Sequence, residues 1–195
     1  MKSIQVTIGI LALSIFTISC SKDDDPLPAK ALFPEENFLQ GYLTTSNFNQ
    51  QVSSQNTSEY YNYGIAFKPK VNGTINSIVI KLPSSDGGVV VRIWKVSTQV
   101  LLKTIPVVVA TNNLEVTIPI DKVPLLKDEE YIVTMKVNSC FVRKRTNGSS
   151  VTYPIEIDNI KITNVIDTSI NSYPGNNSRL NYYFGDISFN FQQTE

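Results

Sequence analysis

The sequence contains no histidine, and this absence excludes several kinds of active site. Without an imidazole the chain cannot form a Ser-His-Asp triad, a Cys-His pair or a zinc site with histidine ligands. The chemistry that remains is that of carboxylates, as in glycoside hydrolases, and the binding of hard cations by oxygen ligands. Since no catalytic constellation stands out among the residues that are present, we predict that the protein is not an enzyme.

The sequence also has few cysteines and no excess of charge of either sign. Cys20 and Cys140 are the two cysteines, too few for a zinc site built from thiolates alone. Cys140 precedes Phe141 and Val142, a setting that favours a small buried apolar residue over a nucleophile. The 17 basic and 17 acidic residues give a formal net charge of zero, so nothing attracts the chain to nucleic acid or to anionic lipid.

The first residues have the pattern of a secretion signal. Lys2 is followed by an almost unbroken apolar run from Ile4 to Ile18, and acidic residues begin soon afterwards. The run is too short for a membrane-spanning helix, and its position at the start of the chain is typical of a signal peptide.

The end of this run resembles the signal of a bacterial lipoprotein. Ser19 and Cys20 match the small residue and the cysteine that close a lipobox, although Thr17 stands where that family usually has leucine. The resemblance implies cleavage before Cys20 and lipid attachment to Cys20. The alternative is an ordinary signal peptide in which Cys20 has no role.

The residues after Cys20 resemble the acidic export tag of surface lipoproteins from Bacteroidetes-type bacteria. The tag is Ser21-Lys22-Asp23-Asp24-Asp25, and it implies a lipid-anchored protein on the outer face of the outer membrane. The alternative is a solvated, self-repelling linker. We therefore expect a signal peptide over residues 1–19, a lipidated Cys20 with an acidic and proline-rich tether over residues 20–34, and one domain over residues 35–195.

The body of the chain has the period-two alternation of β-strands. Val89, Val91 and Ile93 share one face of the strongest strand, and Arg92 and Trp94 share the other. Similar alternation recurs at 114–120, 131–137 and 180–191, with turn residues between the strands. No convincing helical period follows the signal. The pattern predicts an all-β fold, an antiparallel two-sheet β-sandwich of jelly-roll type.

Three local expectations follow from the same pattern. Residues 38–44 are expected as a short aromatic-containing stretch among the strands, and residues 45–58 as a polar loop. Asn72 and Gly73 tolerate the positive φ of a tight turn and predict a hairpin.

The order of several short motifs is similar to that of an uncharacterised family of secreted bacterial all-β domains. This resemblance implies a fold and a secreted context, but no activity. The motifs are Gly64 with Phe67, Gly73-Thr74-Ile75, Ile93-Trp94, Leu101-Leu102, Tyr131-Ile132-Val133, Asn181-Tyr182-Tyr183, Asp186-Ile187 and Phe189.

Aromatic residues are the candidate ligand-binding residues. Trp94 beside Arg92 suits a platform for a sugar ring, or else Trp94 is buried between its strand and a loop. Two tyrosine clusters have the same two interpretations, a binding surface or core, because tyrosine combines an apolar ring with a polar hydroxyl. These clusters are Tyr60, Tyr61 and Tyr63, and Tyr182 and Tyr183.

Charged residues offer weaker candidates. Arg143-Lys144-Arg145 either grips acidic sugars or protects an exposed edge strand from self-pairing, and the second interpretation is favoured. No loop has the regular aspartate spacing of a known calcium motif, so no cofactor or metal site is predicted, and a structural calcium remains an unsupported alternative. Carboxylates lie scattered at turns and strand ends, namely Asp86, Asp121, Asp128, Asp158 and Asp186.

The sequence therefore predicts a non-catalytic cell-surface lipoprotein that binds an extracellular ligand, with a glycan as the leading candidate. The alternative is a structural or adhesive surface subunit that binds another protein through sheet edges or the tyrosine-rich surface. The third hypothesis is a glycoside hydrolase that uses two carboxylates.

Overall fold

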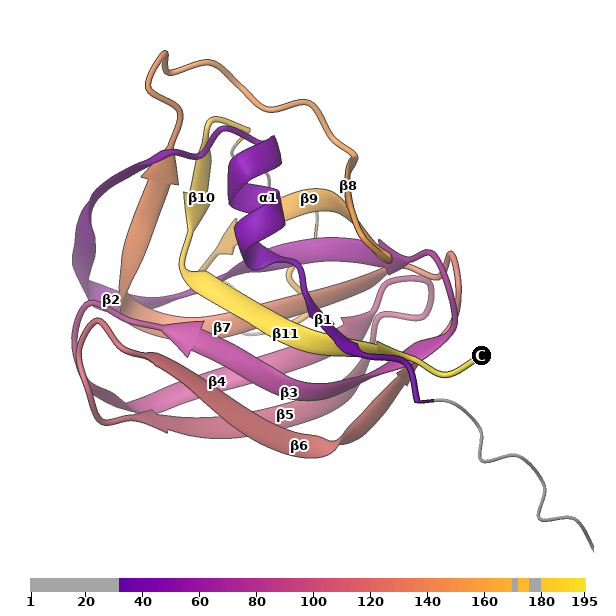
Figure 1. Ribbon diagram of the computed structural model, residues 1–195. Coiled ribbons are helices and arrows are strands. Elements are labelled where there is room, and N and C mark those ends of the chain that lie inside the picture. The colour runs from indigo at the N-terminus through magenta and orange to yellow at the C-terminus, as the bar shows by residue number, and fades with distance from the viewer. Residues whose placement is uncertain (1–31, 170–171, 176–179) are drawn as a thin grey trace, which may run out of the picture. The chain divides into compact units, whose positions relative to one another are not determined.

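The computed structural model describes residues 32–169, 172–175 and 180–195, with backbone alone for residues 52–58 (Figure 1). The predicted signal peptide, the predicted lipidation residue Cys20 and most of the predicted tether lie outside these residues. The described part contains helix α1 (Leu39–Thr45) and strands β1 (Glu35–Asn37), β2 (Gln50–Pro69), β3 (Gly73–Lys81), β4 (Asp86–Lys95), β5 (Val100–Val109), β6 (Glu115–Leu125), β7 (Tyr131–Lys144), β8 (Ile155–Ile157), β9 (Ile160–Thr168), β10 (Tyr182–Phe184) and β11 (Asp186–Gln193).

The strands form two antiparallel sheets that pack face to face, which confirms the predicted β-sandwich. One sheet has four strands in the order β1-β11-β3-β6. The other has seven, in the order β5-β4-β7-β2-β9-β8, with β10 paired to the end of β7. Most neighbouring strands are distant in sequence, as in jelly rolls and Greek keys.

The core lies between the inner faces of the sheets. Its alternation follows the sequence, because period-two residues of each strand point to one side. In the four-stranded sheet Ile78, Ile80 and Phe189 are fully buried, and Ile65 and Phe67 face them from β2. The described strands and the core lie within residues 32–195, which form one compact unit.

Residues 38–44, expected among the strands, belong mostly to helix α1. This expectation was wrong because a helix of two turns is too short to show a clear period. Packing stabilises it instead: Tyr42 is fully buried and makes edge-to-face contacts with Phe48 and Tyr183 at centroid distances of 5.9 and 5.3 Å. Such local helices depend on tertiary contacts rather than on propensity.

Two further expectations were wrong. Residues 50–58, expected as part of a loop, belong to strand β2, which pairs with β7 from Gln50 onward. Backbone hydrogen bonds to β7 hold this polar segment extended, so side-chain polarity did not reveal it. The turn at Asn72 and Gly73 does not form a hairpin, because β3 pairs with β11 and β6 and not with β2. The turn instead carries the chain from one sheet to the other.

Candidate functional site

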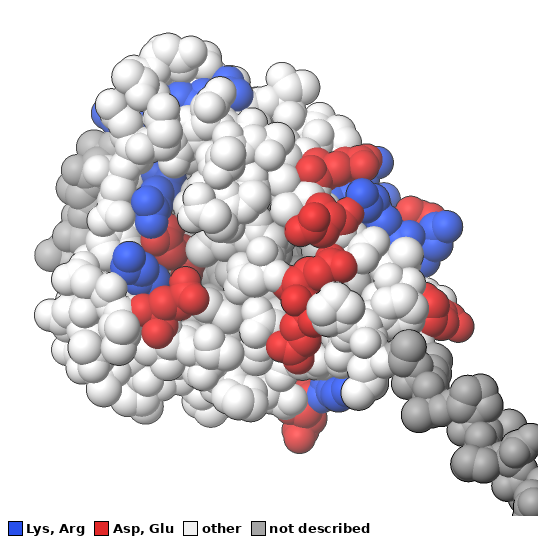
Figure 2. Space-filling view, in the orientation of Figure 1, with Lys and Arg blue, Asp and Glu red and all other residues white. Residues whose placement is uncertain are grey.

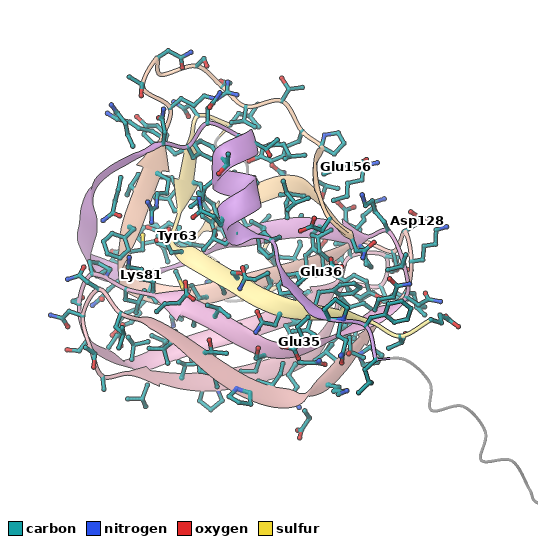
Figure 3. The ribbon with its side chains drawn as sticks, in the orientation of Figure 1. Glu35, Glu36, Tyr63, Lys81, Asp128 and Glu156 are labelled. Atoms are coloured by element: carbon teal, nitrogen blue, oxygen red, sulfur yellow. The ribbon has the colours of Figure 1, made fainter. Side chains whose placement is uncertain are left out.

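The main candidate site is a groove on the outer face of the four-stranded sheet, beside helix α1. Its volume is about 420 Å³, a size typical of small-molecule sites. We call it the α1 groove. It is lined by Asn37, Leu39, Gln40, Leu43, Val79, Lys81, Glu115, Thr117, Arg143, Asp186 and Asn190. Figure 2 shows blue and red side chains alternating down the left part of the visible face, and Lys81 is labelled on that side in Figure 3.

The outward-facing residues of three strands form the floor of the groove. Val79 and Lys81 lie on β3, opposite the outer residues of β6 and β11, while the alternate residues of these strands face the core. Asn37 joins this floor to helix α1. Its Oδ1 accepts hydrogen bonds from the backbone N–H of Leu39 at 3.1 Å and from Ser188 Oγ at 2.6 Å, and its Nδ2 donates to Asn190 Oδ1 at 3.1 Å.

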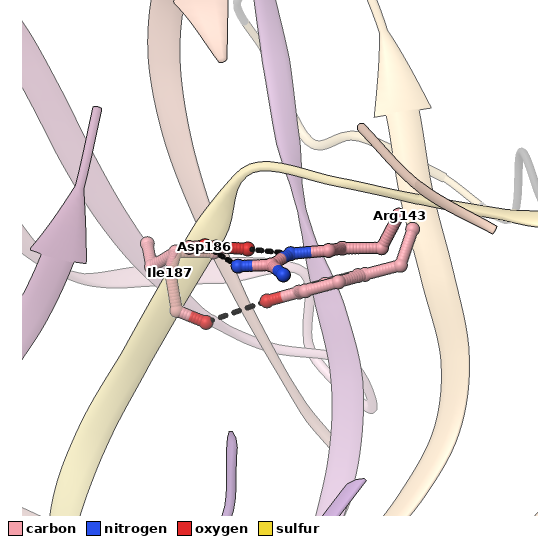
Figure 4. A network of polar contacts seen from close by, with 4 residues as sticks. Arg143, Asp186 and Ile187 are labelled. Carbon is pink, nitrogen blue, oxygen red and sulfur yellow. Dashed lines mark hydrogen bonds and ion pairs between the residues drawn. The ribbon is translucent and has the colours of Figure 1, made fainter. Parts of the chain in front are cut away.

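A buried ion pair fixes one wall of the groove (Figure 4). Arg143 Nε donates to Asp186 Oδ1 at 3.0 Å, and Nη2 donates to Oδ2, so the guanidinium binds the carboxylate through two atoms. Asp186 is 2 % exposed. Tyr183 donates from its hydroxyl to the carbonyl oxygen of Ile187 at 2.8 Å and completes this network. The hydrogen bond to Asp186 raises the pKa of Arg143 above its usual value, so Arg143 stays charged.

Gly185 places Asp186 in this position. It lies between β10, which pairs with the larger sheet, and β11, which belongs to the smaller one, and its φ is +77°. A Cβ at this residue would lie 2.2 Å from Met135 Cε. The left-handed backbone favours glycine, whereas Met135 Cε ends a flexible side chain that could shift, so it is the backbone that lets the chain turn and present Asp186 to Arg143.

Several polar groups in the groove are available to a ligand. Among the described residues, the side chains of Lys81, Glu115 and Thr117 make no hydrogen bond or ion pair. Lys81 Nζ lies 5.6 Å from the centroid of the Phe141 ring, which keeps the ammonium near the groove. The groove therefore offers a donor, an acceptor and a hydroxyl beside apolar contacts from Leu39, Leu43 and Val79.

The structure corrects the favoured interpretation of Arg143, Lys144 and Arg145. They do not protect an exposed edge, because this end of β7 is flanked by β2 and β10. Arg143 is bound to Asp186. Arg145 braces a loop: its Nε donates to the carbonyl of Ser46 at 2.7 Å, and its Nη1 donates to Ser149 Oγ and to the carbonyl of Ser150.

Trp94 lies away from the groove, on the outer face of the larger sheet. It is 8 % exposed and packs with Ala66, Ile132 and Ile166, and Tyr173 covers it with an edge-to-face contact at 5.9 Å. Of the two interpretations that the sequence allowed for Trp94, this is burial between a strand and a loop. Arg92 is partly buried near it, and its Nη1 donates to Asn62 Oδ1 at 3.4 Å. In this position the indole ring offers no open face to a sugar.

The predicted tyrosine clusters divide between core and surface. Tyr63 and Tyr183 are core residues at 3 and 0 % exposure. Tyr61 stacks on Tyr63 at 6.0 Å and is partly buried, as is Tyr182, which contacts Phe184. Tyr60 is 41 % exposed and lies under Lys136 Nζ, 5.6 Å from its ring centroid. The five tyrosines therefore do not form one exposed binding surface.

The carboxylates remain scattered in the structure. Asp186 is bound to Arg143, and Asp121 Oδ2 forms an ion pair with Lys103 Nζ at 2.8 Å. Asp86 Oδ1 accepts from the backbone N–H of Gly88 at 2.7 Å. Within residues 32–169, 172–175 and 180–195, no cluster of acidic, histidine or cysteine side chains is placed to hold a metal ion. No helix in the same ranges is both long and apolar enough to span a membrane.

Sequence reasoning missed most of the groove. Lys81, Glu115 with Thr117, and Asn190 come from three strands, β3, β6 and β11, that are not consecutive, so no local motif connects them. Arg143 and Asp186 were both noted in the sequence, but 43 positions separate them and nothing local pairs them. One signal was available. Lys81 lies on a strand whose alternate residues are apolar, so its side chain was expected to point outward.

Comparison with known proteins assigns no family to the chain. It matches no protein-family model, and a search of curated proteins finds no significant relative.

Proposed function

We propose that the protein is a non-catalytic lipoprotein of the outer bacterial surface that binds an extracellular glycan in the α1 groove. The observation that carries this proposal is the set of uncommitted polar side chains of Lys81, Glu115 and Thr117 beside the fixed Arg143–Asp186 pair. Sugar hydroxyls both donate and accept hydrogen bonds, so they suit a groove that presents both kinds of partner next to apolar side chains.

The position of the groove supports this function. The chain enters the domain at β1, where Glu35 pairs with Gln192 and Gln192 pairs with Thr74. Lys81 lies seven residues further along β3 than Thr74, which corresponds to about 20 Å of extended strand. In Figure 3, Lys81 is labelled at the left of the molecule and Glu35 well to its right. The described chain therefore enters the domain at the end of β3 away from Lys81.

The state of the carboxylates argues against a glycoside hydrolase. Such enzymes need two carboxyl groups that flank the scissile bond. In the groove, Glu115 is uncommitted, but Asp186 is buried and both of its oxygens accept hydrogen bonds from Arg143. Asp186 thus has a structural role and is not free to act as an acid, a base or a nucleophile.

Glycan binding is tested with a panel of bacterial, plant and host polysaccharides and purified residues 32–195. We expect the domain to bind one class of glycan, and Lys81→Met and Thr117→Val each to weaken binding about fivefold, as expected for one lost hydrogen bond. Trp94→Phe is the matched control and should leave the affinity unchanged. The proposal fails if no glycan binds, or if Trp94→Phe abolishes binding while Lys81→Met has no effect.

Anchoring is tested separately in cells. Cys20→Ala should abolish incorporation of labelled fatty acid and move the protein from the outer-membrane fraction to a soluble one. External protease should degrade the wild-type protein on intact cells if it faces outward. An unchanged membrane fraction in the Cys20→Ala strain would contradict the lipid anchor.

A structural or adhesive surface subunit remains the second candidate. It is favoured by the edge strand β5, where Val100, Leu101, Leu102 and Val108 are exposed, since exposed edge strands pair with other chains. This alternative predicts a negative glycan panel.

A further inference from the structure

We infer that the α1 groove binds a linear polysaccharide along its length, across several sugar units, and not a single sugar or a chain end. This inference rests on the proposed glycan-binding function. The groove continues past Arg143 into a second hollow of about 320 Å³, which shares Gln40, Leu43 and Arg143 as lining residues. A third hollow of about 350 Å³ shares Asn47 and Asn49 with the second.

Neighbouring hollows share lining residues, so the three hollows lie in series along the surface. One end reaches Glu115 and Thr117 on β6, which is an edge strand of its sheet. The other end reaches Thr146 and Asn147 in an exposed turn after β7. The residues at both ends are exposed to solvent, which suits a polymer that extends past each end better than a single sugar or a chain end.

Fixed hydrogen-bond donors occur at intervals along this path. Arg143 uses Nε and Nη2 to bind Asp186, and its Nη1 makes no hydrogen bond to any described residue. Arg145 uses Nε and Nη1 to bind Ser46, Ser149 and Ser150, and within the described part of the chain its Nη2 has no hydrogen-bond partner. Each guanidinium is held by its structural contacts, so little side-chain entropy is lost when its remaining nitrogen binds an oxygen.

The composition of the path fits a polysaccharide better than an apolar ligand. Between the two arginines, polar side chains dominate, including Gln40, Thr44, Asn47 and Asn49, while Phe48 is 1 % exposed. Hydroxyl, ring and bridging oxygens recur along a polysaccharide and match donors that recur along a groove. Because each sugar unit adds similar contacts, affinity should grow with chain length until the groove is filled.

The test is calorimetric titration of residues 32–195 with size-fractionated oligosaccharides, from disaccharide to octasaccharide, prepared from the polysaccharide that binds in the panel. We expect affinity to rise about tenfold or more between the disaccharide and the hexasaccharide and then to level off. Reducing-end modification of the longest chain should leave its affinity unchanged, because the ends extend beyond the groove.

Two variants at opposite ends of the path sharpen this test. Lys81→Met and Asn147→Ala should each weaken binding of the hexasaccharide, and at most one of them should affect the disaccharide. Affinity that is independent of chain length, or lost on end modification, would overturn the inference and leave the proposed glycan binding intact. Failure of every polysaccharide and oligosaccharide to bind would overturn both.

Discussion

Three tyrosine hydroxyls lie buried near helix α1, and they make the stability of the fold depend on pH in the alkaline range. The hydroxyls of Tyr42 and Tyr153 are 2.6 Å apart and share a hydrogen bond, and Tyr183 donates to Ile187. Burial raises the pKa of Tyr153 to about 12, and it raises the pKa values of Tyr42 and Tyr183 well above the usual 10.0. The folded protein therefore keeps these groups neutral at pH values where the unfolded chain ionises them.

This difference predicts a loss of stability at high pH. Below about pH 10 both states hold the tyrosine protons, so the stabilisation is fully present. Between pH 10 and 12 the unfolded chain releases protons that the folded state retains. The free energy of unfolding should then fall by up to about 1.4 kcal/mol per pH unit for each such tyrosine. Urea unfolding at a series of pH values measures this slope.

The variant Tyr153→Phe shows how much of the change in unfolding free energy with pH comes from Tyr153. It should lower the free energy of unfolding at pH 8 by about 1 kcal/mol, because Tyr42 loses its hydrogen-bond partner. Above pH 10 the variant should show a shallower decline than the wild type, since one tyrosine no longer titrates. Equal slopes in the two proteins would contradict the assignment.

At the residue scale, the sequence showed which face of a strand a side chain occupies, but not which distant residue that side chain contacts. Alternation placed Arg92 and Trp94 on one face of β4, and the structure confirms this. It could not show that Tyr173, 79 positions later, covers Trp94. For the same reason the Arg143–Asp186 pair could not be predicted, because pairing across strands depends on sheet order.

At the scale of elements, alternating strands such as β4, β6 and β7 were predictable, and α1 and the start of β2 were not. The predictable strands have one apolar face, and this face is recorded in the sequence with period two. Helix α1 and residues 50–58 owe their structure to neighbours, namely the aromatic cluster around Tyr42 and the backbone of β7. Tertiary contacts of this kind leave no local pattern.

Strand β2 depends on Gly64 for its pairing with β7. A Cβ built on Gly64 would lie 1.9 Å from the carbonyl oxygen of Val133, which is backbone and cannot move aside without breaking the ladder. Gly64→Ala should therefore lower the free energy of unfolding by about 3 kcal/mol. Urea unfolding at pH 8 measures the loss.

Gly87→Ala is the matched control for this substitution. Gly87 lies in β4, and no atom lies within 4 Å of the Cβ that alanine would add. The two variants change the same chemical group, so a difference between them reports packing against β7 alone. If both variants were as stable as the wild type, the close approach of β2 and β7 at Gly64 would be wrong.

At the scale of the whole molecule, the point where the chain enters the sandwich and the α1 groove lie at different ends of the four-stranded sheet. The chain enters at Glu35, at one end of the four-stranded sheet, and Lys81 and Asp186 pair at its other end. The sequence predicted the sandwich and the attachment signal, but it placed the binding residues on Trp94 and the tyrosines. The α1 groove depends on helix α1 and on strand order, and neither could be read locally.

The most direct test of the account is a nuclear magnetic resonance titration of isotope-labelled residues 32–195 with the glycan that binds in the panel. Backbone amide signals report which surface a ligand touches. We predict that perturbed signals will cluster along α1 and at Lys81, Glu115, Thr117 and Asn190, with little change at Trp94. Perturbations centred on Trp94 and Tyr173, or on the edge strand β5, would contradict the assignment of the α1 groove as the binding site.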